Sequence, residues 1–309
     1  MAWYRLRVLI AGVAVGISVL GCGGVIKRMA IHTMSDMMAA GQRVYEREPD
    51  LELAAQALAA NLKLIEVMLE SAPQHPVLLL QATQGFATYA YAVAEGQLAE
   101  AQHRASGDVV THTRRTRDLY RRGLQYGLRL LSRHHVDWRQ AASLETDGLR
   151  DRLQQLTPKA VPALFWTAFC WGGVLNMNRD ALDTLTALPR FEALLMRLVE
   201  LDETYFYGAP HLLLAVHYAS RAPMLGGKPA QAKLHFERAT ELSQGELLLI
   251  PLLEAQYYAV QIQDRAHFVA SLQRVLQASE KRLPEQAFLN ALAKQRAALL
   301  LERVNDLFV

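Results

Sequence analysis

The chain has 309 residues, and its 33 lysines and arginines nearly balance its 30 aspartates and glutamates. Arg5 and Arg7 lie in the N-terminal leader described next, so the remainder of the chain is almost neutral. A nucleic-acid-binding protein would show a clear basic excess, and the balance therefore argues against nucleic acid as a partner. The length is sufficient for one large domain or two small ones with a substantial core.

The N-terminal segment predicts a secretory signal peptide over residues 1–21. Residues 1–7 carry two arginines and no acid, and residues 8–20 contain no charged side chain. A basic start, an apolar stretch and small residues at the end are the three regions of such a signal. The apolar stretch is too short to span a bilayer, which takes about 20 residues.

The signal ends in Val19-Leu20-Gly21-Cys22, which resembles the bacterial lipobox. The resemblance implies cleavage before Cys22 and acylation of this cysteine, and stable membrane anchoring requires more than one such signal. An ordinary secretory signal with an incidental cysteine is the alternative. No aspartate follows Cys22 to indicate retention at the inner membrane. We therefore expect a bacterial periplasmic protein held to a membrane by its lipid anchor only, with the outer membrane favoured over the inner.

The rest of the chain predicts an all-α protein. Residues 22–44 are expected to form the lipid-anchored tether and a first helix, and residues 45–309 a single helical-repeat domain. Apolar residues recur at three- and four-residue spacing in two early sets, Leu58, Leu62, Ile65 and Leu69, then Leu78, Ala82, Phe86 and Tyr89. Runs with the two-residue period of strands do not occur. Breaks between helices are expected at 71–76, 106–108, 133–137, 157–162, 176–179, 186–189, 207–210, 223–229 and 245.

A recurring small–large–small pattern predicts tetratricopeptide-like helix pairs stacked into an α-solenoid. The clearest set is Ala232, Phe236 and Ala239, after a first helix with Ala215 and Tyr218. Two more sets share this spacing: Phe191, Leu195 and Leu198, and then Phe268, Leu272 and Val275. Weaker sets are Ala60, Leu64 and Val67, and Thr116, Tyr120 and Gly123. The spacing between sets is irregular, so the repeats are degenerate, and a helical bundle is the alternative architecture.

Several segments resemble the T-component family associated with tripartite ATP-independent periplasmic (TRAP) transporters. They are VPALFWTAFCWGG (161–173), residues 191–245, DLYRRGLQYGLRLL (118–131) and the terminal residues 300–309. GGKPAQAKLHFERA, within the second segment, is the most distinctive part. Pro229 after Lys228 is a mild departure, because relatives often have an acidic or polar residue there.

The resemblance implies a periplasmic lipoprotein built of degenerate tetratricopeptide-like helix pairs. It implies a homo-oligomer, with a trimer as one candidate, around an apolar channel or cavity for a small apolar or amphipathic organic ligand. The implied protein partner is the substrate-binding P-component of a TRAP transporter, which composition and periodicity do not by themselves indicate. The alternative is an envelope-assembly scaffold lipoprotein whose concave surface binds protein segments.

No set of residues predicts catalysis, a cofactor or a metal site. Lys228 and the glycines before it lack the spacing and the Ser/Thr of a phosphate-binding loop, and a turn between helices is expected instead. His134, His135 and Asp137 are too close in sequence for the usual helical ligand spacing, and a helix C-terminus explains them better. Cys170 lies in an apolar setting and is expected to be buried, with an intermolecular disulfide as the alternative. We therefore expect no enzyme.

The densest charge cluster suggests a docking surface. Arg114, Arg117 and Arg121 share one face of a predicted helix. They form either a solvated outer face or a contact for an acidic patch on the partner protein.

The densest aromatic cluster suggests a ligand cavity. It comprises Phe165, Trp166 and Phe169, together with Tyr205 and Tyr207 at a later helix junction. Phe165 and Phe169 share a helical face, whereas Trp166 points about 100° away, so more than one face is apolar. Part of this cluster must be ordinary core. We expect some of the five residues to border an apolar cavity that oligomerisation completes.

Overall fold

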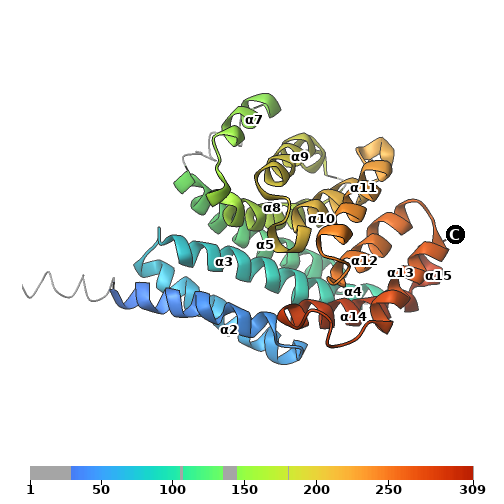
Figure 1. The fold of residues 1–309 in the computed structure, drawn as a ribbon, viewed down its shortest axis with the longest axis horizontal. Helices are drawn as coiled ribbons and strands as arrows, with labels where there is room; N and C mark the ends of the chain where they lie inside the picture. The colour runs from blue at the N-terminus through green and yellow to red at the C-terminus, as the bar shows by residue number, and fades with distance from the viewer. Residues whose placement is uncertain (1–28, 105–106, 135–144, 180, 309) are drawn as a thin grey trace, which may run out of the picture.

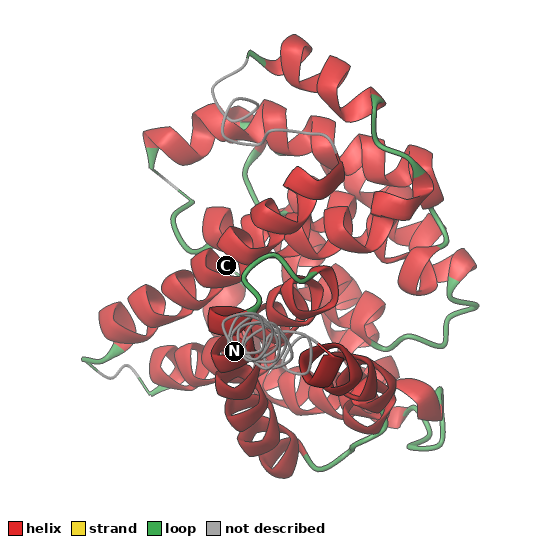
Figure 2. Ribbon diagram, turned by 90° about the vertical axis from the view of Figure 1, so that its left-hand side faces the viewer, coloured by secondary structure: helices red, strands yellow, loops and turns green. Residues whose placement is uncertain are grey.

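The computed structural model describes residues 29–104, 107–134, 145–179 and 181–308, which form helices joined by short loops (Figures 1 and 2). No strand occurs among these residues. The prediction of an all-α protein is therefore confirmed. The expected signal peptide and Cys22 lie outside the described residues.

The helices of the first half lead from the N-terminus to the centre of the molecule. Residues 29–46 are helical, followed by α2 (Leu51–Ser71), α3 (Pro76–Tyr89), a π-helical segment (Ala90–Ala94), α4 (Glu95–His103), α5 (Val109–Leu131), a 3-10 turn (Ser132–His134), α7 (Thr146–Gln154), a second 3-10 turn (Pro158–Ala160) and α8 (Val161–Asn176).

The second half continues with longer and shorter helices in alternation. Its elements are α9 (Leu182–Asp202), α10 (Tyr205–Ala219), a 3-10 turn (Pro223–Leu225), α11 (Pro229–Leu242), α12 (Leu249–Leu253), a second π-helical segment (Glu254–Ala259), α13 (Arg265–Gln277), a 3-10 turn (Pro284–Gln286), α14 (Ala287–Glu302) and α15 (Val304–Leu307).

Local sequence signals account for several helix ends. The Asp50 carboxylate accepts hydrogen bonds from the N–H groups of Glu52 and Leu53, both at 3.0 Å, and so caps the start of α2. Pro76 and Pro229 stand in the first turns of α3 and α11, where a missing N–H group has no cost. Gly245 ends the turn after α11 with a φ of 69°, which glycine adopts without strain.

The expected break at 186–189 is wrong, because α9 continues through Pro189. A proline inside a helix removes one backbone hydrogen bond and usually kinks or ends it. Here Ala187 and Phe191, on either side of the proline, are both buried in the core. Tertiary packing of this face therefore outweighs the local preference to end the helix.

The predicted repeat anchors are mostly buried. Ala232, Phe236 and Ala239 are at most 1% exposed, and α11 packs along α10. The weak set at Ala60, Leu64 and Val67 is different, because all three side chains are exposed. That part of the register is wrong: α2 buries the face of Leu58, Leu62, Ile65 and Leu69, as the three- and four-residue spacing predicted.

The C-terminal helix returns to the N-terminal half of the molecule. In Figure 1, α14 lies beside α2, although the two are more than 200 residues apart in the chain. The Arg296 guanidinium of α14 contacts the Glu95 carboxylate at 3.5 Å and donates to the Tyr91 carbonyl oxygen. In an open solenoid each repeat contacts only its neighbours. Here α14 instead contacts α2, and its residues Phe288 and Leu289 line the space described below.

Helix α5 crosses α3 and α8 at unusually close range. A Cβ atom at Gly123 would lie 2.6 Å from the Cys170 sulfur, and one at Gly127 would overlap the Thr167 hydroxyl. Only glycine therefore fits at these two crossings. None of the described helices is both long and apolar enough to cross a bilayer.

Candidate functional site

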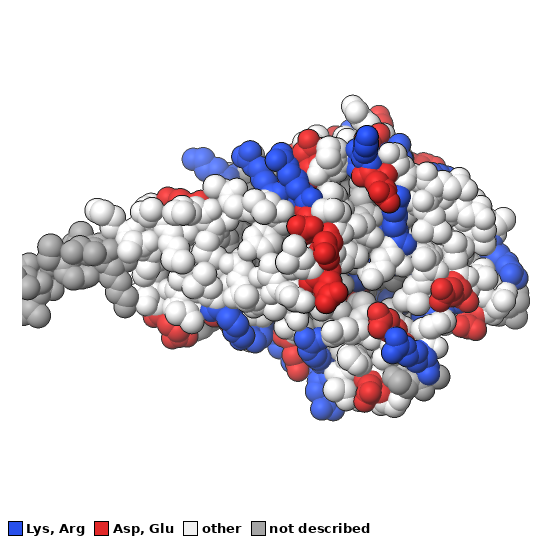
Figure 3. Space-filling model, turned by 90° about the horizontal axis from the view of Figure 1, so that it is seen from below, with Lys and Arg blue, Asp and Glu red and all other residues white. Residues whose placement is uncertain are grey.

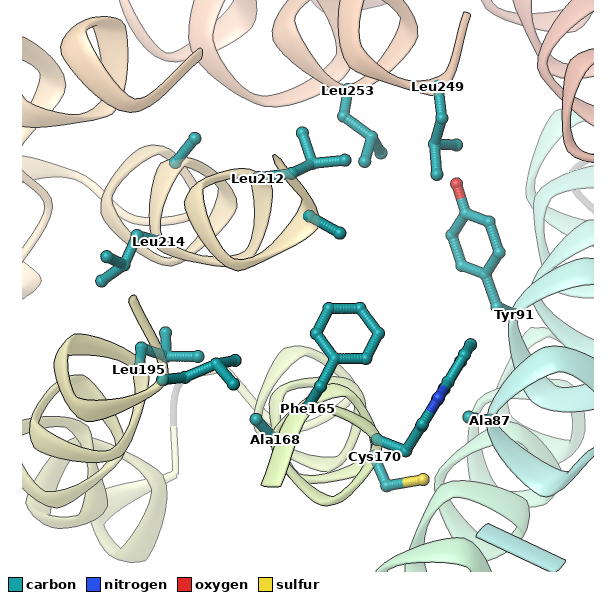
Figure 4. Close-up of a cluster of buried hydrophobic side chains, with 14 of the residues drawn as sticks. Ala87, Tyr91, Phe165, Ala168, Cys170, Leu195, Leu212, Leu214, Leu249 and Leu253 are labelled. Atoms are coloured by element: carbon teal, nitrogen blue, oxygen red, sulfur yellow. The ribbon is translucent and has the colours of Figure 1, made fainter. Parts of the chain in front are cut away.

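A cavity of about 200 Å³ lies where helices from both ends of the chain face α8 and α10. Its wall is mostly apolar and includes Leu58, Leu62, Ile65, Leu212, Leu249 and Leu253. Figure 4 shows Leu212, Leu249 and Leu253 bordering this space together with Phe165 and Tyr91. Concave, mostly apolar sites with a few polar groups are typical of small-molecule binding.

Three of the predicted aromatic residues line the cavity: Phe165, Trp166 and Phe169 of α8. The Phe165 and Trp166 rings pack edge to face at 5.0 Å, and Trp166 lies 5.8 Å from Phe169. Such contacts hold the rings in fixed orientations. Their role toward a ligand stays a prediction.

The other two predicted aromatics do not line the cavity; their neighbour Phe206 does. The residues Phe206, Tyr207 and Gly208 have φ values of 47°, 61° and 80°, so the first turn of α10 is left-handed. This turn brings the Phe206 ring to 5.9 Å from Trp166 and leaves Tyr205 packed on Phe165 at 5.2 Å. The break expected at 207–210 overlaps this turn, but helical spacing does not predict which ring enters the cavity, because side-chain directions there no longer follow the α-helical period.

Tyr91, Glu95 and Tyr120 form a polar part of the wall, and together with Arg296, which contacts Glu95, we name them the Glu95 cluster. The Tyr120 hydroxyl donates to Glu95 Oε1 at 2.6 Å, and Arg296 Nη1 lies 3.5 Å from Glu95 Oε2. The Arg296 guanidinium also lies 4.0 Å from the centre of the Tyr91 ring. Burial raises the pKa of Glu95, although the guanidinium opposes this shift.

The two π-helical segments of the chain border this cluster. Tyr91 belongs to the segment Ala90–Ala94, which ends next to Glu95, and Tyr257 belongs to the segment Glu254–Ala259. Both tyrosines line the cavity, and the Arg179 guanidinium lies 5.6 Å from the Tyr257 ring centre. Single turns of π-helix occur frequently at functional sites. Sequence periodicity gave no signal for either segment.

Several buried polar atoms at the cavity wall have no hydrogen-bond partner among the described residues. They are the Tyr91 hydroxyl, Gln81 Oε1, Gln286 Oε1 and His217 Nδ1. More than nine in ten buried polar groups in proteins are hydrogen-bonded to protein or water. Such groups require a hydrogen-bond partner, which water or a ligand can supply.

A second polar part of the wall comes from the end of α10. His217 and Arg221 are 7% and 6% exposed, and both line the cavity. His217 Nε2 lies 4.0 Å from Glu192 Oε2, and Arg221 donates to the Ser220 hydroxyl at 2.8 Å. Burial lowers the pKa of His217 to about 4, so this imidazole is neutral at pH 7.

The distinctive glycine–lysine–proline segment forms a turn between α10 and α11, as the sequence predicted. Lys228 donates its backbone N–H to the Tyr218 carbonyl at 2.9 Å, and its ammonium group contacts Glu192 at 2.8 Å. Gly226 has a φ of 92°, and a Cβ at Gly227 would overlap the Arg221 carbonyl. The segment therefore fastens the helix pair beside the cavity.

The predicted docking residues Arg114, Arg117 and Arg121 lie on the outer side of α5. Asp118 contacts Arg117 at 3.7 Å and Arg121 at 3.1 Å. The side chains of Arg117 and Arg121 remain 30% and 51% exposed, and the group keeps a net positive charge. On the face of the molecule seen in Figure 3, Lys and Arg occur in small groups among Asp and Glu.

A neighbouring stripe of arginines has a structural role that sequence reasoning missed. Arg115, Arg122 and Arg129 recur every seven residues along α5. Their guanidinium groups lie 5.9, 4.7 and 5.4 Å from the ring centres of Tyr89, Phe86 and Tyr126. Each contact buries part of an arginine against an aromatic face. The seven-residue spacing of these arginines was the feature of the sequence that could have revealed the stripe.

The remaining reactive side chains are structural or lie beyond the described part. Cys170 is fully buried, burial raises its pKa, and its thiol approaches the Thr83 carbonyl at 3.7 Å. The alternative of an intermolecular disulfide at Cys170 is therefore wrong. Within the described residues no three His, Cys, Asp or Glu side chains converge to hold a metal ion. His134 ends a 3-10 turn, and His135 and Asp137 fall outside the described ranges.

Comparison with known proteins places this architecture in a family. A protein of Treponema pallidum (strain Nichols), described as an uncharacterized protein, is 28% identical over 274 residues, which cover 86% of this chain and 83% of the relative. The family model described as TRAP transporter T-component matches residues 47–308, which include every residue of the Glu95 cluster and the aromatic wall. The chain therefore belongs to the TRAP transporter T-component family.

Proposed function

We propose that the protein is a lipid-anchored periplasmic accessory protein that docks the substrate-binding P-component of a TRAP transporter. In this proposal it also holds, or passes on, a small apolar or amphipathic organic ligand in its cavity. Membership of the T-component family supports the link to a TRAP transporter. The observation that carries the ligand-holding part is the mostly apolar cavity with buried polar atoms that lack partners among the described residues.

The chemistry of the wall suits binding by desolvation. The apolar side chains favour a hydrocarbon group by about 25 cal/mol for each Å² removed from water. The rings of Phe165, Trp166 and Phe169 are held by one another, so a ligand meets a preformed surface. Preformed surfaces lose little conformational entropy when they bind.

The anchor and the assembly form part of the same proposal. Acylation of Cys22 would hold the following helix, residues 29–46, close to a membrane, with the outer membrane favoured. The buried anchors of α9, α10, α11 and α13 support tetratricopeptide-like helix pairs. A homo-oligomer, for which a trimer is one candidate, would extend the cavity between subunits.

Docking is tested by co-purification with a TRAP P-component of the same organism. The mature chain without its lipid should retain the P-component on an affinity column. Replacing Arg114, Arg117 and Arg121 by alanine should slow association with the P-component and make its rate less dependent on salt. Exposed charges accelerate the diffusional encounter of two proteins, and salt screens this effect. A matched control removes three exposed arginines from other surfaces: Arg43, Arg150 and Arg274. Equal binding by both variants would remove the docking role of α5, and no retention by the parent protein would refute docking.

Ligand holding is tested by native mass spectrometry of the purified protein and by tryptophan quenching with candidate apolar and amphipathic molecules, organic acids and alcohols included. A bound molecule should add mass, and quenching should disappear in a Trp166→Phe variant but persist in Trp171→Phe. Trp171 is the matched control because it stacks on Phe191 and does not line the cavity. A protein without added mass and without quenching would make these aromatics ordinary core. Retention of unfolded protein segments but no P-component would favour the scaffold alternative.

A further inference from the structure

The Tyr91 hydroxyl is an unusual feature of the cavity wall. The tyrosine is 9% exposed, its hydroxyl makes no hydrogen bond of ordinary geometry among the described residues, and the Arg296 guanidinium lies against its ring. In Figure 4 this hydroxyl points toward Leu249 across the space that Phe165 also borders. Burying an unpaired hydroxyl is unfavourable, because the group loses its hydrogen bonds to water. A bound molecule that hydrogen-bonds to it would recover this loss.

Glu95 offers a second hydrogen-bonding group next to Tyr91. The two residues are four apart along a π-helical and helical stretch, and both line the cavity. A carboxylate has about four acceptor positions. The Tyr120 hydroxyl occupies one at 2.6 Å, and Arg296 approaches the other oxygen at 3.5 Å. Acceptor capacity therefore remains on the side of Glu95 that faces the cavity.

The charge of the Glu95 cluster selects the kind of headgroup. Glu95 and Arg296 form an opposite pair whose side chains are only 17% and 11% exposed. The guanidinium is already engaged with Glu95, the Tyr91 carbonyl and the Tyr91 ring. A carboxylate headgroup would be repelled by the charge of Glu95 at short range, and an ammonium headgroup would be repelled by Arg296. Both would also lose hydration, which is costly for a buried ion. A neutral hydroxyl avoids both costs.

We propose that the Glu95 cluster binds the hydroxyl headgroup of an aliphatic alcohol, with Tyr91 as hydrogen-bond donor and Glu95 as acceptor. This inference rests on the proposed ligand-holding function and names the ligand class of that cavity. The apolar part of the molecule lies against Phe165, Trp166 and Phe169. A cavity of about 150 Å³ accommodates benzene, and the 200 Å³ available here suits a short alkyl chain.

The test measures binding of tritiated 1-octanol to the full mature chain in lipid nanodiscs, with empty nanodiscs as the partition control. Unlabelled 1-octanol, octanoate and 1-fluorooctane compete for the site. They share the chain and differ in the headgroup. We expect octanol to compete more strongly than either of the others, by about tenfold.

Two variants separate the headgroup from the chain. Tyr91→Phe removes the hydroxyl and should weaken octanol about three- to tenfold while leaving fluorooctane unchanged. Tyr45→Phe is the matched control, because it also removes a hydroxyl from a cavity-lining tyrosine but outside the Glu95 cluster. Glu95→Gln leaves Arg296 without its counter-charge and should shift preference from octanol toward octanoate. Melting temperatures establish that the variants fold, and either variant alone is sufficient for the test.

The outcomes distinguish the inference from the proposed function. Equal competition by octanol and fluorooctane, together with an unchanged Tyr91→Phe variant, would overturn the headgroup site and leave a purely apolar cavity. Octanoate as the strongest competitor of the parent protein would overturn the choice of an uncharged headgroup. If none of the three compounds binds above the nanodisc control, the ligand-holding function itself fails.

Discussion

Substitution of Gly127 by alanine tests the closest helix crossing in the molecule. Gly127 lies on α5, where an added methyl group would overlap the Thr167 hydroxyl of α8 and approach the Thr83 methyl of α3 at 3.1 Å. Neither threonine can rotate away at low cost. Thr167 donates to the Ala163 carbonyl at 2.6 Å and Thr83 to the Leu79 carbonyl at 2.7 Å, both in the buried core.

Two opposing effects decide the magnitude. Alanine is favoured over glycine inside a helix by about 1 kcal/mol. Overpacking a core costs about 1–3 kcal/mol, and breaking a buried hydrogen bond of either threonine costs a further 1–3 kcal/mol or so. The steric effect is therefore larger. We expect the free energy of unfolding of Gly127→Ala to fall by about 1–5 kcal/mol.

Urea unfolding followed by circular dichroism measures this change. The matched control is Gly96→Ala in α4, because a Cβ atom there meets nothing within 4 Å. That variant should keep the parent stability or gain up to about 1 kcal/mol from helix propensity. A Gly127→Ala protein as stable as the Gly96→Ala protein would refute the close approach of α5, α3 and α8.

Three further predictions address packing, pH and anchoring. Ala239→Trp should lower the free energy of unfolding by at least about 1–3 kcal/mol, because Ala239 is fully buried where α11 packs on α10. As a control, Ala230→Trp should change it little, because Ala230 is exposed. Equal melting temperatures for the two variants would place α11 in another register. As pH falls from 6.5 toward 4, His217 takes up a proton in the unfolded chain but stays neutral in the folded chain, where its pKa is about 4. The free energy of unfolding therefore falls by up to about 1.4 kcal/mol per pH unit in this range. His217→Gln should remove this part of the pH slope in urea titrations at pH 7 and 5, and an unchanged slope would contradict the assignment. Cys22→Ser should abolish acyl labelling and release the protein from the membrane fraction, and an unmodified wild-type cysteine in mass spectrometry would exclude the anchor.

Features encoded within one or two helical turns could be predicted from the sequence. The buried face of α2 and the buried anchors Phe236 and Phe268 follow from apolar spacing, because one face of a helix must leave water. Phe165, Trp166 and Phe169 were predicted to border a cavity, because their segment holds more large aromatic residues than one buried face of a helix accommodates. The resemblance to the T-component family rested on local segments, and the family comparison confirmed it.

Features that depend on contacts between distant segments could not be predicted in this way. The continuation of α9 through Pro189 opposes local preference, and tertiary packing decides it. A break was expected at 207–210, but the left-handed φ of Phe206 and the resulting direction of its ring could not be predicted. The exposed side chains of Leu64 and Val67 show the same limit, since their spacing also fits a repeat anchor.

The sequence by itself determined the helices, most of their buried faces and the family of this protein. Only the tertiary structure decided the cavity and its polar cluster, because Arg296 meets Glu95 across 201 residues. Helical periodicity reports which face of a helix is buried, but it does not report which other helix covers that face. The contact between α14 and the first helices joins segments that lie far apart in the chain, and it brings Arg296 to Glu95 at the cavity wall.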